Sequence, residues 1–116
     1  MTHATLEQFC MQLAGTTQDI KWGHDLCYLV GRKMYCVTGL DTPLFVSFKV
    51  LPLEFTELTD REGIIPAPYS ARNHWVLVER PGALSEKEWR YYIQQSYELV
   101  LAGLTQKLQR QIRPGI

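Results

Sequence analysis

The residues that could perform acid–base or metal chemistry are scattered along this chain of 116 residues. His3, His24 and His74 lie far apart, and none has a second histidine one helical turn away. A metal site built from His24, Asp25 and Cys27 would need side chains that alternate across a strand to converge on one ion. The sequence contains no nucleophile elbow, phosphate-binding loop, glycine-rich dinucleotide motif or zinc-protease motif. We therefore expect no enzymatic activity, no metal and no cofactor.

Basic side chains, in contrast, gather in two stretches. Residues 32–49 hold Arg32, Lys33 and Lys49 against the single acid Asp41, and residues 107–113 hold three cations and no acid. Residues 54–62 are mainly acidic. The formal net charge of zero argues against strong nucleic-acid binding, and an ordinary solvated surface is the simpler explanation of these clusters. Both interpretations stay open at this point.

The elements that would position these charges are organised around one long helix, Ser85–Gly103. Ser85 and Glu88 form a capping box at its start, and Gly103 is placed to adopt a left-handed conformation at its end. Apolar residues recur at three- and four-residue steps and so form one broad face of this helix. We expect a face of this width to pack against a sheet. We expect the buried side chains of this face to include Trp89, Ile93, Tyr97 and Val100.

Residues 17–49 show the alternation of a strand meander. A turn at Gly31-Arg32, with glycine first, predicts a type II′ hairpin between Leu26–Val30 and Lys33–Gly39. Counting outward from this turn places Cys27 opposite Cys36. Since three cysteines without a C-x-x-C motif argue against a disulfide framework or a zinc site, we expect free thiols.

The remaining segments complete an α+β fold, a two-layer domain in which helices cover one face of an antiparallel sheet. A first helix is predicted near Leu6–Ala14 with a capping box at Thr5, and a short helix at Pro52–Leu58 that packs inward through Leu53, Phe55 and Leu58. The two prolines of Ile64–Tyr69 suit an edge strand or an extended loop. A further strand is predicted at Trp75–Glu79 and a last helical turn at Gln106–Gln111. The order is α, β-meander, α, β, α within a single domain, residues 1–116.

The start of the chain lacks the basic beginning and apolar middle of a signal peptide, and no apolar run approaches the length of a membrane span. We therefore expect a cytoplasmic protein without a membrane partner. The oligomeric state does not follow from the sequence.

Several segments together resemble the MmcQ/YjbR-like family of small bacterial proteins. They are Trp22-Gly23 followed by LCYLVGRKMYCV, then Ser47-Phe48-Lys49 with Pro52 after it, then PAPYSARNHWVLV, and finally SYELVLAGL in the long helix. The resemblance depends on the order and spacing of these segments and extends from the first helix to about Leu108. The chain departs from the family pattern at Ser70-Ala71, where relatives often carry bulkier or more basic residues.

The resemblance implies a CyaY-like fold and DNA binding through a sheet surface similar to the double-wing motif of a phage transcription factor. On that basis the candidate nucleic-acid-binding residues are Arg32, Lys33, Lys49, Arg72, Asn73 and His74. Tyr28, Tyr35 and Trp75 could stack on bases or be purely structural. The alternative is a protein-interaction module like the type III secretion chaperones, which share this general layout. Because one fold hosts many functions, a contiguous basic groove on the uncovered face of the sheet would favour nucleic acid, and a mixed apolar patch would favour protein.

Overall fold

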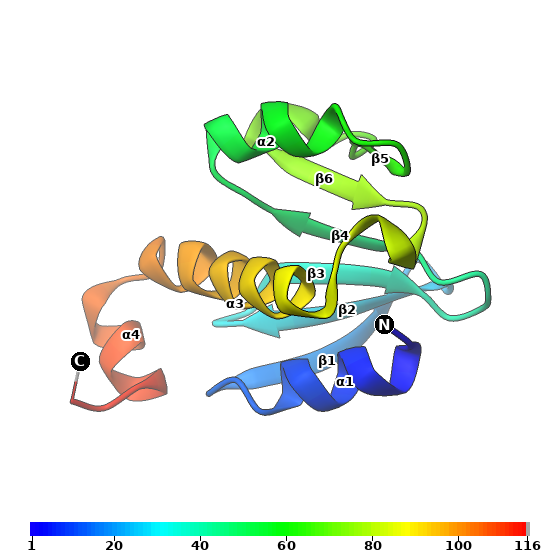
Figure 1. The fold of residues 1–116 in the computed structure, drawn as a ribbon. Helices are drawn as coiled ribbons and strands as arrows, with labels where there is room; N and C mark the ends of the chain where they lie inside the picture. Colours follow the sequence, from blue (N-terminus) through cyan, green and yellow to red (C-terminus); the bar gives the residue numbers. More distant parts are fainter. Residues whose placement is uncertain (116) are drawn as a thin grey trace.

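The structure, a computed structural model, describes residues 1–115. Its centre is a six-stranded antiparallel sheet in the order β1-β2-β3-β4-β6-β5, and four α-helices pack against it (Figure 1). The strands are β1 Thr16–Lys21, β2 Asp25–Val30, β3 Lys33–Gly39, β4 Val46–Lys49, β5 Ile64–Pro66 and β6 Trp75–Val78. The α-helices are α1 His3–Met11, α2 Pro52–Thr59, α3 Glu86–Ala102 and α4 Gln106–Ile112. The predicted α+β class and the edge position of β5 are confirmed.

Helix α3 crosses the sheet and supplies much of the core, as its sequence pattern predicts (Figure 1). Ser85 caps α3, and Trp89, Ile93 and Tyr97 are buried against the sheet. The indole Nε1 of Trp89 donates to the carbonyl of Pro81 at 2.9 Å, which satisfies its only polar atom. Val100 is half-buried. The prediction for Gly103 was wrong: its φ is −82°, because the chain passes directly into α4 without a left-handed residue.

A β-bulge in β3 overturns the predicted cysteine pairing. The register runs from Leu29 opposite Met34 to Tyr28 opposite Cys36, so β3 has one extra residue, Tyr35, at this point. Tyr35 and Cys36 are therefore both buried in the core under the helices. Cys27 lies opposite Val37 instead. The expectation of free thiols is confirmed for all three cysteines, and burial raises the pKa of the Cys36 thiol well above its ordinary value.

Ser96 of α3 compensates for this bulge. Its buried hydroxyl donates to the backbone carbonyl of Tyr35 at 2.6 Å and accepts the backbone N–H of Lys49 at 3.0 Å. A buried backbone group without a partner is costly, so a serine on an otherwise apolar helix face has a clear structural reason. The serine ties the start of β3 and the end of β4 to the helix layer.

Three further expectations need correction. Both Gly31 (φ 56°) and Arg32 (φ 68°) are left-handed, which is the pattern of a type I′ turn, whose twist matches that of the flanking strands, and not of type II′. Helix α1 starts earlier than predicted because Thr2, not Thr5, caps it by accepting from the backbone N–H of Thr5. Leu53 is 71% exposed, since two residues in a helix correspond to about 200° of rotation from the inward-facing Phe55.

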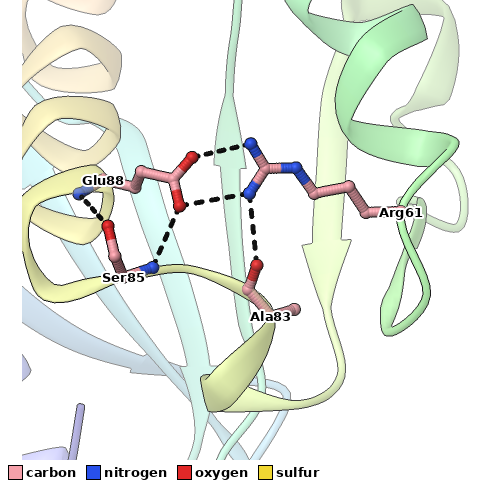
Figure 2. Close-up of polar contacts among 4 residues, drawn as sticks. All are labelled: Arg61, Ala83, Ser85 and Glu88. Carbon is pink, nitrogen blue, oxygen red and sulfur yellow. Dashed lines mark hydrogen bonds and ion pairs between the residues drawn. The ribbon is translucent and has the colours of Figure 1, made fainter.

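The N-terminus of α3 is joined to the end of α2 by a bidentate ion pair (Figure 2). Glu88 accepts from the two terminal nitrogens of Arg61 at 3.1 and 2.6 Å and from the backbone N–H of Ser85 at 3.0 Å. Arg61 also donates to the carbonyl of Ala83. The hydrogen bonds from Arg61 and then from the Ser85 backbone hold the pKa of the Glu88 carboxyl at about 2, below its ordinary value. The capping box of α3 thus also connects this helix to the segment that follows α2.

Candidate functional site

The antiparallel register brings the predicted site residues to one end of the sheet. The turn between β2 and β3 carries Arg32 and Lys33, and β4 ends beside the start of β3 with Lys49. Lys49 pairs with Trp75, the first residue of β6. The segment that precedes β6 contains Arg72, Asn73 and His74, so it lies at the same end. Residues distant in sequence are therefore neighbours in the fold.

Helix α4 adds more cations to this end, because it packs beneath the β2–β3 turn (Figure 1). A Cβ at Gly31 would lie 2.5 Å from Leu104 Cδ1 and 3.2 Å from Leu108 Cδ2, so a larger residue would have to displace these leucine side chains, and the left-handed backbone (φ 56°) also favours glycine. Lys107 and Arg110 are exposed on α4. We call the resulting surface the basic end and define it as Arg32, Lys33, Lys49, Arg72, Lys107 and Arg110.

The cations of the basic end are not neutralised locally. None of the six forms an ion pair with a carboxylate of residues 1–115. Arg113 of the same region does pair with Glu98, at 2.7 Å, and lies over the ring of Tyr97. Because the whole chain has zero formal net charge, this concentration of unpaired cations leaves an excess of carboxylates over the rest of the molecule. The charge is therefore unevenly distributed along the sheet, although α2, which carries Glu54 and Glu57, also begins next to Lys49 at the basic end.

The opposite end of the sheet, which we call the acidic end, contains the β1–β2 turn, the end of β6 and the start of α3. Three of its arginines are paired with carboxylates, Arg61 with Glu88, Arg80 with Glu62 and Arg90 with Glu86, whereas Lys21 and Lys87 at this end form no ion pair within residues 1–115. His24 contacts Asp25 at 2.9 Å in the same region.

Among the candidate residues, His74 is the least available. Its ring packs edge-on against Phe55, with the centroids 5.8 Å apart, and its backbone carbonyl accepts the N–H of Val50. Tyr28 and Tyr35 are fully buried, so they are structural and cannot stack on a base. Burial raises the pKa of Tyr28 to about 12. Trp75 is half-buried beside Lys49 and remains the accessible aromatic of the three.

The face of the sheet turned away from the helices, which we call the open face, is mainly apolar. Side chains opposite each other in adjacent strands share a face. The register therefore defines one row across all six strands, and its members are Asp19, Cys27, Val37, Ser47, Leu77 and Ile65. Lys49 and Trp75 form the next row toward the basic end. The open face is thus a mixed apolar surface with cations at one margin.

The described part of the chain contains no group of three or more His, Cys, Asp or Glu residues placed to hold a metal ion. Nor is any helix within residues 1–115 long and apolar enough to cross a membrane.

The family assignment follows from a match between residues 11–99 and the YjbR family model. This chain belongs to the YjbR family. The family resemblance inferred from the sequence is therefore confirmed. A search of curated proteins found no match.

Two solved structures resemble this YjbR-family chain. One is the Deinococcus radiodurans protein DR2400, which carries domain DUF419; it is 26% identical with a TM-score of 0.87, and the match covers 96% of this chain and 87% of that one. The other is a protein from Pseudomonas syringae, 22% identical with a TM-score of 0.70, covering 85% of this chain and 98% of that one. The second likeness concerns the fold alone.

Two features of the candidate site were not predicted from the sequence: the packing of α4 beneath the β2–β3 turn and the exposure of Tyr69. The cationic run of residues 107–113 was recognised, but nothing local indicates that α4 packs under the β2–β3 turn. Tyr69, fully exposed in the segment that leads to Arg72, was assigned only to an edge strand or loop. The signal that was available is the small residue Gly31, which permits close approach of another element.

Proposed function

We propose that this YjbR-family chain binds nucleic acid through the basic end, with its lysine and arginine side chains against backbone phosphates. The observation that carries the proposal is the convergence of six cations, from the β2–β3 turn, β4, the segment before β6, and α4, without carboxylate partners among residues 1–115. Lysine and arginine side chains that neutralise phosphates displace the cations condensed on the nucleic acid, and the release of these cations into solution is the main source of nonspecific affinity.

The geometry favours contact with the phosphate backbone over reading of base edges. The Gly31-Arg32 turn is tight and presents Arg32 and Lys33 as exposed neighbours at the tip of a hairpin. Such contacts position a protein but carry no sequence information. With a net charge of zero, we expect binding in the micromolar range that is typical of nonspecific association.

The test is a salt titration of binding to a labelled DNA duplex, compared between the parent chain and Arg32→Ala/Lys33→Ala. Each lost phosphate contact should reduce the slope of log affinity against log salt by about one, so the double variant should lose about two. Arg80→Ala/Lys87→Ala removes the same charge from the acidic end and should leave the slope unchanged. Equal slopes in the two double variants, or no binding of any nucleic acid at low salt, would contradict the proposal.

A second candidate function, a protein-interaction module, is favoured by the composition of the open face. Val37, Leu77 and Ile65 are partly exposed apolar members of one row, and apolar centres with polar margins are typical of protein interfaces. Leu77→Arg would abolish binding by this face while leaving the basic end intact. Loss of nucleic-acid affinity in Leu77→Arg, with the fold retained, would instead connect the open face to the first function.

A further inference from the structure

Tyr69 is a residue whose conformation the fold itself does not explain. Its side chain is fully exposed, at 104% of the reference area, so it makes almost no packing contact. Its backbone is left-handed, with φ 68°, a region that is unfavourable for an aromatic residue and that glycine or asparagine would occupy with less strain. Strain that no buried contact offsets points to a role outside folding.

The segment around Tyr69 is held in place by backbone hydrogen bonds. The N–H of Ser70 donates to the carbonyl of Ala67 at 3.3 Å, and the N–H of Asn73 donates to the carbonyl of Ser70 at 3.1 Å. Ala67 is in turn fixed by donation to the carbonyl of Trp75 at 3.0 Å. The exposed ring is therefore presented from an ordered turn, which lowers the entropy lost when a ligand stacks on it.

Cations at the same end of the sheet as Tyr69 favour a ligand that carries phosphate. Arg72 is exposed three residues further along, and Lys49 lies at the end of the strand that pairs with β6. The combination of an exposed aromatic ring with cations at the same end of the sheet suits a nucleotide, which offers a π-face and a phosphate together.

Trp22 provides an internal comparison at the other end of the sheet. It is also exposed (67%) and left-handed (φ 55°), but it lies beside the His24–Asp25 pair at the acidic end. The only cation within three residues of Trp22 along the chain is Lys21, which is outnumbered there by Asp19 and Asp25, so this ring has no excess of positive charge beside it to attract a phosphate. Trp22 is thus the natural control for Tyr69.

We propose that Tyr69 is a stacking platform for an unpaired base, so that the basic end prefers single-stranded nucleic acid to a duplex. This inference rests on the proposed function and specifies its substrate class. Bases inside a duplex are already stacked on their neighbours, whereas every base of a single strand can place its π-face on an aromatic ring. Arg72 and Lys49 would then contact the phosphates on either side.

The experiment measures fluorescence anisotropy with labelled single-stranded and duplex DNA of equal length at one low salt concentration. The parent chain should bind the single strand more tightly. Tyr69→Ala should weaken single-strand binding by about 5- to 100-fold, the range for loss of one stacked base, and leave duplex binding nearly unchanged. Tyr69→Phe should retain the affinity because the π-face is kept, and Trp22→Ala should match the parent.

The outcomes separate this inference from the proposed function. If the parent chain binds duplex at least as well as single strand, or if Tyr69→Ala leaves single-strand affinity unchanged, the stacking role is wrong while phosphate binding stands. An equal loss on both ligands in Tyr69→Ala would also overturn it, since stacking discriminates between them. If neither DNA binds at low salt, the proposed function itself fails. Circular dichroism of each variant confirms that the fold is retained.

Discussion

At the acidic end of the sheet, Arg61, Arg80 and Arg90 each contact a carboxylate, whereas no carboxylate of residues 1–115 pairs with Arg32, Lys33 or Arg72 at the basic end. The two ends differ in the geometry of their charged groups as well as in the number of ion pairs. Glu88 receives Arg61 in a bidentate arrangement that also closes a helix cap. The cations of the basic end come from turns and helix surfaces whose own elements supply few acids.

Arginine therefore serves two purposes in this small domain, stabilising the fold where it is paired and remaining free to bind a ligand where it is not. A paired arginine connects elements of the fold, and its removal should reduce stability. An arginine without a protein partner contributes little to folding, because isolated surface charges seldom change stability by more than about 0.5 kcal/mol. It remains available to an external anion. Measurements of the free energy of unfolding should therefore distinguish substitutions at the acidic end from substitutions at the basic end.

The largest effect is expected at the acidic end, for Trp89→Ala. Trp89 is 2% exposed, stacks on Phe48 with ring centroids 6.1 Å apart, and donates to Pro81. Truncation of a buried aromatic residue should lower the free energy of unfolding by about 3–5 kcal/mol. Urea denaturation monitored by far-UV circular dichroism measures the loss. A change below about 1 kcal/mol would show that α3 is not the centre of the core.

Ser96→Ala should have the next largest effect, at the point where α3 supports the basic end. The substitution leaves the Tyr35 carbonyl and the Lys49 amide without their buried partner. We expect a loss of about 1–3 kcal/mol, the usual penalty for a buried unsatisfied polar group. Hydrogen exchange should show faster exchange of the Lys49 amide than in the parent chain. Unchanged protection of that amide would mean that water or a shifted strand replaces the serine.

Glu88→Gln tests the paired cation at the acidic end. At pH 7 we expect a loss of about 1 kcal/mol, because the ion pair is partly solvent-exposed and its full electrostatic energy is screened. The folded-state pKa of Glu88, about 2, lies below the ordinary value of 4.5 for a glutamate carboxyl. Its ionisation therefore stabilises the fold above about pH 4.5, and that contribution is lost as the pH falls toward 2.

The pH dependence provides the measurement. The difference in unfolding free energy between the parent chain and Glu88→Gln should shrink between pH 4.5 and pH 2. Glu86→Gln is the matched control: it removes a carboxylate from the same helix turn, but one paired with Arg90 on a strongly exposed surface. Its effect should stay below about 0.5 kcal/mol. A pH-independent difference for Glu88→Gln would contradict the assigned pKa.

The elements of this fold were largely predictable from sequence because their signals are local. The capping box at Ser85 and Glu88, the hairpin at Gly31 and the cap at Thr105 each depend on residues within a few positions of one another. The bulge at Tyr35 was not predictable in this way. It depends on Ser96, a residue 61 positions further along the chain, which satisfies the carbonyl that the bulge diverts from the ladder.

The candidate site was likewise predictable only where its signals are local. That Arg32 and Lys33 lie together at a hairpin tip follows from the turn signal alone. That Lys107 and Arg110 join them depends on Leu104 and Leu108 packing over Gly31, a contact between distant segments. Net charge was a poor guide for the same reason, since it sums over two ends that the fold keeps apart.

The smallest predicted effect has the opposite sign from the others and gives the sharpest test of the comparison. Arg32 is left-handed, with φ 68°, at the second central position of a type I′ turn, where glycine is the preferred residue. Arg32→Gly should therefore raise the free energy of unfolding by about 0.5 kcal/mol, the relief of strain exceeding the added backbone entropy of the unfolded chain. The same variant should weaken nucleic-acid binding and reduce the salt slope by about one. If Arg32→Gly is more stable than the parent chain but binds nucleic acid more weakly, then Arg32 serves binding at a cost to the stability of its turn. A loss of stability in Arg32→Gly would instead mean that this cation supports the fold as Arg61 does, and the distinction between the two ends would not hold.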